Sequence, residues 1–183
     1  MLLSTTRLQV ERLADSHAQW LCSYLTENRK HLERWEPLRS EEYYSERSCL
    51  QRIQTSEDEH SAGVSLKLVA IMPSGHEIVA VCDFTNISRG PFQACNVGYS
   101  IAQKHQGNGL MTEFLGASVD YVFDKLCLHR VMANYMPENR ASARVLEKLQ
   151  FEVEGYAKSY LKIAGNWRDH ILTAKVDPSA QSD

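Results

Sequence analysis

The sequence lacks long apolar runs and shows no excess of positive charge. No stretch approaches the ~20 apolar residues that a membrane-spanning helix needs, and residues 1–12 carry no apolar segment typical of a secretory signal peptide. The formal net charge of the 183 residues is −3, so no general basic field attracts nucleic acid. We therefore expect a cytoplasmic protein that is bound neither to a membrane nor to nucleic acid.

Cysteine is sparse, and its spacing excludes the usual structural uses. The cysteines are odd in number, lie far apart and form no CxxC pair: Cys22, Cys49, Cys82, Cys95 and Cys127. This pattern indicates reduced thiols rather than disulfides or a zinc site, and we expect no metal. Repeats and low-complexity tracts are also absent. The length then predicts a single domain over 1–176, followed by a disordered tail at 177–183.

Hydrophobic periodicity predicts an alternation of strands and helices. Apolar and alternating runs predict strands at 6–13, 66–72, 77–87, 93–102, 130–136, 151–163 and 167–175. Helical spacing predicts helices after Asp15, at 31–37, at 41–60, at Leu110–Leu126 and from Asn139 to about Leu149. The order β-α-α-β-β-β-α-β-α-β-β fits an α/β (α+β) fold. Its sheet would be mixed and mostly antiparallel, with one parallel pair and helices on its faces.

Two closely spaced glycines, Gly107 and Gly109, join one predicted strand to the long helix at Leu110–Leu126. Glycine lets a ligand approach the backbone, and the first N–H groups of a helix are free to bind an anion such as phosphate. A Walker loop is excluded, because no Lys-Ser or Lys-Thr pair follows Gly109. A dinucleotide fingerprint is disfavoured, because Thr112 occupies the position of its third small residue. An ordinary glycine turn before a helix remains the alternative.

Three segments resemble motifs of one enzyme family. Residues 104–109, Lys-His-Gln-Gly-Asn-Gly, resemble the acyl-coenzyme A loop (R/Q)-x-x-G-x-(G/A) of the GNAT N-acetyltransferases, with Lys104 in place of Arg or Gln. Residues 139–142, Asn-Arg-Ala-Ser, and residues 148–155 resemble motifs of the Rim-type members, in which Gln150 replaces a usual glycine. The predicted element order also matches the GNAT fold, and the resemblance covers nearly the whole chain.

This resemblance implies acetyl-coenzyme A (acetyl-CoA) as the acetyl donor. It also implies that the acceptor is the N-terminal alanine amine of a small-subunit ribosomal protein. Backbone N–H groups at the helix start would bind the pyrophosphate, and the pantetheine arm could pair with the strand before it. The expected donor contacts are Ile101, Gln106, Gly107, Asn108, Gly109, Leu110, Met111, Thr112 and Asn139. Asn139 could instead act only as a helix N-cap.

The resemblance also assigns Ser142 as the proton donor to the departing thiolate. The alternative is an ordinary first-turn serine, and Tyr135 on the preceding strand is a rival donor. The base is less defined, because the late hairpin lacks the glutamate of Rim relatives. Asp83, Glu36 and Tyr99 are candidates, and an amine with a pKa near ~7.7–8 could also lose its proton to water.

In a GNAT fold the segment after the first helix and the last hairpin flank the acceptor. Trp35 and Trp167 could then form flat walls for a peptide, while Glu36 and Asp169 attract its ammonium group. Tyr99 would lie between acceptor and donor. In the alternative interpretation both tryptophans are core residues and Asp169 pairs with a neighbour.

Three functions are compatible with these patterns. The first is a protein N-terminal acetyltransferase. The second is a GNAT enzyme that acetylates a small amine, such as an amino acid or a polyamine. The third is a sensor that binds acyl-CoA without turnover, which the presence of Asn139 and Ser142 disfavours. The sequence indicates no oligomeric state.

Overall fold

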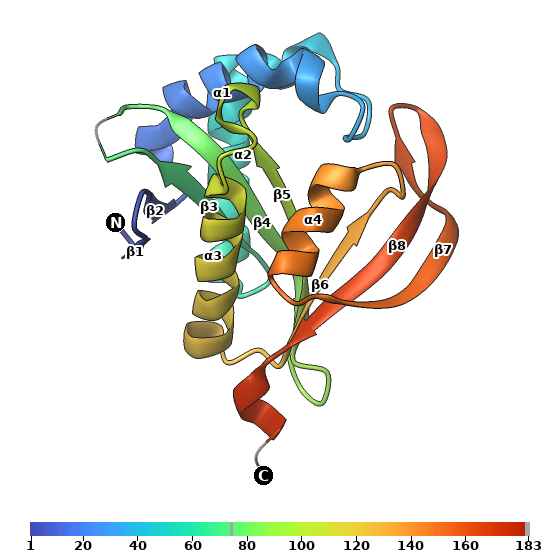
Figure 1. Cartoon of the computed structure of the whole chain (residues 1–183). Helices are drawn as coiled ribbons and strands as arrows, with labels where there is room; N and C mark the ends of the chain where they lie inside the picture. Colours follow the sequence, from blue (N-terminus) through green and yellow to red (C-terminus); the bar gives the residue numbers. More distant parts are fainter. Residues whose placement is uncertain (74, 182–183) are drawn as a thin grey trace.

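The computed structural model describes residues 1–73 and 75–181, and its centre is a mixed eight-stranded sheet. The spatial order is β1-β2-β3-β4-β5-β6-β8-β7 (Figure 1). The strands are β1 (Leu3–Ser4), β2 (Gln9–Arg12), β3 (Leu66–Ile71), β4 (Ile78–Ser88), β5 (Ala94–Ile101), β6 (Arg130–Tyr135), β7 (Glu152–Ile163) and β8 (Asn166–Val176). β5 and β6 pair in parallel, and the other neighbouring strands pair antiparallel. The predicted fold class is therefore confirmed.

Helices cover both faces of the sheet. α3 (Leu110–Leu126) and α4 (Arg140–Lys148) lie on one face, and α1 (Ala18–Leu32) and α2 (Glu46–Ser61) lie on the other (Figure 1). The sequence of strand β3 is almost entirely apolar because the strand lies between the two helical layers. Its Leu68 belongs to the core under α3, whereas the adjacent Val69 belongs to the core under α1 and α2, and both are fully buried.

The sheet opens between β5 and β6, and this opening positions the functional site. Their pairing runs from Ala94 opposite Arg130 to Asn96 opposite Met132, and stops there. Beyond this point the two strands diverge, and α4 lies at the opening (Figure 1). The end of β5, from Val97 to Ile101, therefore has β4 on one side and no strand partner on the other among the described residues.

Three local predictions need correction, two for helices and one for a strand. The helix predicted at 31–37 does not form separately, because α1 continues to Leu32 and the chain then turns. The helix predicted at 41–60 is interrupted by the extended Ser45 (φ −75°, ψ 151°), whose hydroxyl caps α2 by accepting the Ser48 N–H at 3.2 Å. The first strand, predicted at 6–13, is β2 in a hairpin with β1. Within the predicted tail, Pro178–Gln181 forms a 3-10 turn, and residues 182–183 lie outside the described part.

Within residues 1–73 and 75–181, no helix combines the length and the apolarity that crossing a membrane requires. All of the cysteines are free; Cys49, Cys82 and Cys95 are buried. Burial raises the pKa of the Cys95 thiol to about 12, so it stays protonated at neutral pH.

Candidate active site

The glycine loop has the geometry of an anion site. Gly107 and Gly109 have φ values of +78° and +76°, a backbone conformation that favours glycine. Gly109 is the N-cap of α3 and supplies no side-chain cap; its carbonyl accepts the Glu113 N–H at 3.0 Å. The N–H groups that come before that of Glu113 in the first turn of α3 therefore have no intrahelical acceptor. They remain available to a ligand.

The side chains of this loop are engaged with the protein rather than with the space in front of it. Leu110 and Met111 are buried in the core. The Gln106 amide lies 3.1 Å from a ring nitrogen of His31, and the Asn108 amide donates to the Gln106 carbonyl. A Cβ built on Gly107 would meet no atom within 4 Å. A ligand in this open space would therefore meet backbone rather than side chains.

A pocket of about 350 Å³ lies at the opening of the sheet. It extends along β5 and reaches both helical layers. Its lining includes Tyr24, Trp35, Glu36, Arg39, Tyr43, Arg52, Lys67, Asp83, Tyr99, Ser100, Asn134, Tyr135, Asn139, Ser142 and His170. Of the predicted catalytic and acceptor residues, the pocket thus brings together Ser142, Tyr135, Asp83, Trp35, Glu36 and Tyr99.

Ser142 and Tyr99 form a hydroxyl pair at the α4 side of the pocket. Their oxygens are 2.6 Å apart. Burial raises the pKa of Tyr99 above its ordinary value, although its hydrogen bond with Ser142 lowers it in part. Tyr99 therefore remains protonated and can donate to Ser142 Oγ, which leaves the Ser142 proton free for another acceptor.

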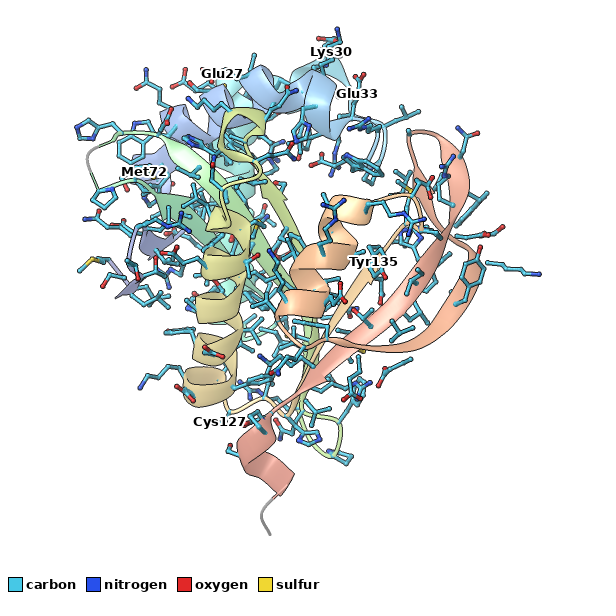
Figure 2. The ribbon with its side chains drawn as sticks, in the orientation of Figure 1. Glu27, Lys30, Glu33, Met72, Cys127 and Tyr135 are labelled. Carbon is cyan, nitrogen blue, oxygen red and sulfur yellow. The ribbon has the colours of Figure 1, made fainter. Side chains whose placement is uncertain are left out.

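Asn139 has the structural role that the sequence left as an alternative. Its Oδ1 accepts the Ser142 N–H at 3.1 Å and caps α4. It also lines the pocket, so the same residue fixes Ser142 at the first turn of α4 and forms part of the pocket wall. Tyr135, on β6, lies between α4 and β8 (Figure 2).

The two pocket carboxylates differ in their environments. Asp83 forms an ion pair with Lys67 at 2.7 Å, and this ammonium group neutralises the charge of the Asp83 carboxylate. Glu36 has only the longer Arg39 contact, 3.8 Å. Burial raises the pKa of Glu36, and the nearby Arg39 and Arg52 lower it to a smaller extent. Of the two carboxylates, Glu36 is therefore the more available to an incoming ammonium group.

The hairpin of β7 and β8 contacts the segment of Trp35, but it does not bring Trp167 and Asp169 to the pocket as predicted. The Ala164 N–H donates to the Glu36 carbonyl at 2.9 Å, so the two stretches do meet. Trp167, however, is 64% exposed and lies outside the pocket lining. Asp169 is also outside, because its carboxylate accepts the Tyr156 hydroxyl and the Ser159 N–H. Of the residues predicted to bind the acceptor from these two stretches, the structure therefore places Trp35 and Glu36 at the pocket, but not Trp167 and Asp169.

Several pocket residues were not identified from the sequence. The hydroxyl of Tyr24, on α1, lies 2.8 Å from that of Ser100. The guanidinium groups of Arg39 and Arg52 both lie over the Tyr43 ring, at 4.4 and 3.9 Å from its centroid. A tyrosine at helical spacing gives no signal that separates core packing from a pocket wall.

Comparison with known proteins identifies the family. The model of the acetyltransferase (GNAT) domain matches residues 7–152. The chain belongs to the GNAT family of acetyltransferases. Their acetyl donor is acetyl-CoA.

The Rim-type resemblance is confirmed as well. This GNAT enzyme is 44% identical over 176 residues to the [ribosomal protein uS5]-alanine N-acetyltransferase of Escherichia coli, covering 96% of this chain and 91% of that protein. The crystal structure of the ribosomal-protein-S5-alanine acetyltransferase from Vibrio fischeri has a TM-score of 0.92 at 37% identity, covering 96% of each chain. RimJ of Mycobacterium smegmatis, in complex with CoA-disulfide, has a TM-score of 0.89 at 26% identity, covering 98% of this chain and 89% of that one.

Among the described residues of this GNAT enzyme, no three His, Cys, Asp or Glu side chains cluster in a way that could hold a metal ion.

Proposed function

We propose that this enzyme transfers the acetyl group of acetyl-CoA to the N-terminal alanine amine of a small-subunit ribosomal protein. The observation that carries the proposal is the 44% identity, over 96% of the chain, to the E. coli enzyme that acts on alanine of ribosomal protein uS5. The proposal is also supported by the pocket, which extends from β5, the strand before the glycine loop, to the half-buried carboxylate of Glu36.

The donor would lie along the open side of β5. Backbone N–H groups of Gly107 and of the first turn of α3 bind the pyrophosphate. The free edge of β5 from Val97 to Ile101 pairs with the pantetheine arm, and Asn139 faces the same arm from α4. This arrangement brings the thioester to the hydroxyl of Ser142.

The reaction needs two protons removed from the ammonium nitrogen and one supplied to the leaving sulfur. The α-ammonium group binds at Glu36 and loses a proton, to this carboxylate or to water. The freed nitrogen lone pair attacks the thioester carbonyl carbon, and the resulting tetrahedral intermediate collapses with cleavage of the C–S bond. Ser142 gives its proton to the departing sulfur while Tyr99 donates to Ser142 Oγ. The nitrogen, positively charged after the attack, loses its second proton to solvent, and solvent returns a proton to the Ser142–Tyr99 pair.

The charges of the pocket favour a peptide over a polyamine. Three cationic side chains, Arg39, Arg52 and Lys67, line it, and Lys67 already neutralises Asp83. A peptide N-terminus brings one positive charge and finds Glu36. A polyamine brings several and finds no second available carboxylate in the lining.

The experiment compares three acceptors by mass spectrometry and by kcat/KM. They are a peptide with the N-terminal sequence of uS5, the same peptide beginning with Leu, and spermidine. We expect the Ala peptide to exceed both others by at least ~10-fold, about 1.4 kcal/mol of transition-state stabilisation. Faster turnover of spermidine would overturn the protein acceptor. Equal rates for the Ala and Leu peptides would overturn the preference for alanine.

A further inference from the structure

The N-terminal hairpin is attached to the start of α3 by a dense set of hydrogen bonds. Thr5 Oγ1 donates to Glu113 Oε1 at 2.6 Å, and the Arg7 backbone N–H donates to the same oxygen at 2.8 Å. The Arg7 side chain donates through Nε to Glu113 Oε2 at 2.7 Å, and its Nη2 lies at the same distance. One carboxylate therefore accepts three hydrogen bonds and has a further ion-pair contact across more than a hundred residues of sequence.

Arg7 also reaches the glycine loop itself. Its Nη1 donates to the Asn108 carbonyl oxygen at 2.9 Å, and its Nη2 would lie 3.6 Å from a Cβ on Gly109. The Asn108 carbonyl belongs to the peptide plane whose N–H is that of Gly109. Fixing this carbonyl toward Arg7 fixes the direction of the Gly109 N–H, which points the opposite way.

The position of Glu113 makes this contact necessary. Glu113 lies in the first turn of α3, at the helix end that binds an anion. An unpaired carboxylate there would repel a pyrophosphate and could take its N–H donors. Paired with Arg7 and Thr5, its charge is neutralised and turned away. The interactions with Thr5 and Arg7 outweigh the effect of burial and lower the pKa of Glu113, so the pair is ionised at neutral pH.

We propose that Arg7 is a positioning residue for the acetyl donor, which fixes the Asn108–Gly109 peptide for the pyrophosphate and neutralises Glu113. This inference rests on acetyl-CoA binding at the glycine loop in the proposed function. An arginine is required, because its planar guanidinium group must donate to the Glu113 carboxylate and to the Asn108 carbonyl at the same time. A lysine supplies the charge but not this geometry.

The test measures the Kd of CoA, with no acceptor present, and kcat/KM for two donors, acetyl-CoA and S-acetylpantetheine, which lacks the pyrophosphate. The variants are Arg7→Met and Arg7→Lys. The control is Arg130→Met, which removes another arginine–glutamate pair, with Glu154, at the start of β6 and away from the loop. Thermal unfolding of each variant verifies folding.

We expect Arg7→Met to raise the Kd of CoA at least ~10-fold and to lower kcat/KM with acetyl-CoA to the same extent. With S-acetylpantetheine the change should stay below twofold, as it should for Arg130→Met with both donors. Arg7→Lys should remain within threefold of Arg7→Met.

Three results would overturn the inference: an unchanged Kd for CoA, equal losses with both donors, which indicate a general structural role, or full rescue by lysine, which indicates charge alone. Failure of the proposed function is distinguishable. In that case the wild-type protein would bind no CoA, or would bind it and leave the uS5 peptide unmodified.

Discussion

The glycine loop gives the sharpest prediction for donor binding, through Gly107→Val. The backbone of Gly107 has φ +78°, and an added side chain would meet no protein atom within 4 Å. The substitution therefore causes no clash inside the protein. It places a branched side chain in the space through which, by the proposed function, the phosphates approach the loop.

The substitution has two separate effects, one on the stability of the fold and one on the binding of the acetyl donor. A side chain in the left-handed conformation costs about 1–2 kcal/mol of stability, which for a chain of this size lowers Tm by roughly 2–8 °C. Donor binding loses at least one hydrogen bond from a backbone N–H to a charged phosphate, worth about 1.5–3 kcal/mol. The KM for acetyl-CoA should then rise at least ~10-fold with little change in kcat.

Gly63→Val is the matched control. Gly63 has φ +72° and equally open surroundings, but it follows α2 and lies outside both the loop and the pocket lining. Its variant should lose a similar amount of Tm and keep its KM for acetyl-CoA. The assay is steady-state kinetics with thermal unfolding on all three proteins. A Gly107→Val variant that unfolds like the control and keeps a wild-type KM would refute the assignment of the loop.

Two further predictions concern the pocket. Ser142→Ala should lower kcat roughly 10²-fold with small changes in KM, and Tyr99→Phe should cause a smaller loss; a decrease under threefold for Ser142→Ala would move the donor role to Tyr135. Glu36→Gln should raise the KM of the acceptor peptide about 10-fold. Because burial raises the pKa of Glu36, its ionised form destabilises the fold at neutral pH, and that cost disappears as the pH falls below the unfolded value. Glu36→Gln should therefore be more resistant to urea than wild type at pH 7, with a smaller difference at pH 4; a less stable variant at pH 7 would contradict this.

The donor half of the site could be predicted from the sequence because it depends on backbone. Glycines with positive φ, a helix start and an uncapped first turn all have local signals, and Gly107, Gly109 and α3 lie where the pattern indicated. The N-cap role of Asn139 also has a local signal, and the structure shows this cap, whereas Ser142 was assigned through the family resemblance.

The acceptor half depends on side chains that come together only in the folded chain. Trp167 and Trp35 looked equivalent in the sequence, but strand β8 turns the first to solvent. The pairing of Asp83 with Lys67 joins two neighbouring strands, and no local pattern indicates that it removes Asp83 from the candidate bases. The contact of Arg7 with Asn108 spans a hundred residues and has no sequence signature at all.

Strand β5 connects the two halves. Tyr99 and Ser100 are adjacent and point to opposite faces, so one hydroxyl meets Ser142 of α4 and the other meets Tyr24 of α1. The contact with Ser142 exists because β6 leaves β5 after Asn96, which gives α4 room to approach the strand end. A shift of β5 would move both hydroxyl contacts together. In the proposed function, the opening of the sheet, rather than any single side chain, would therefore set the distance between the two substrates.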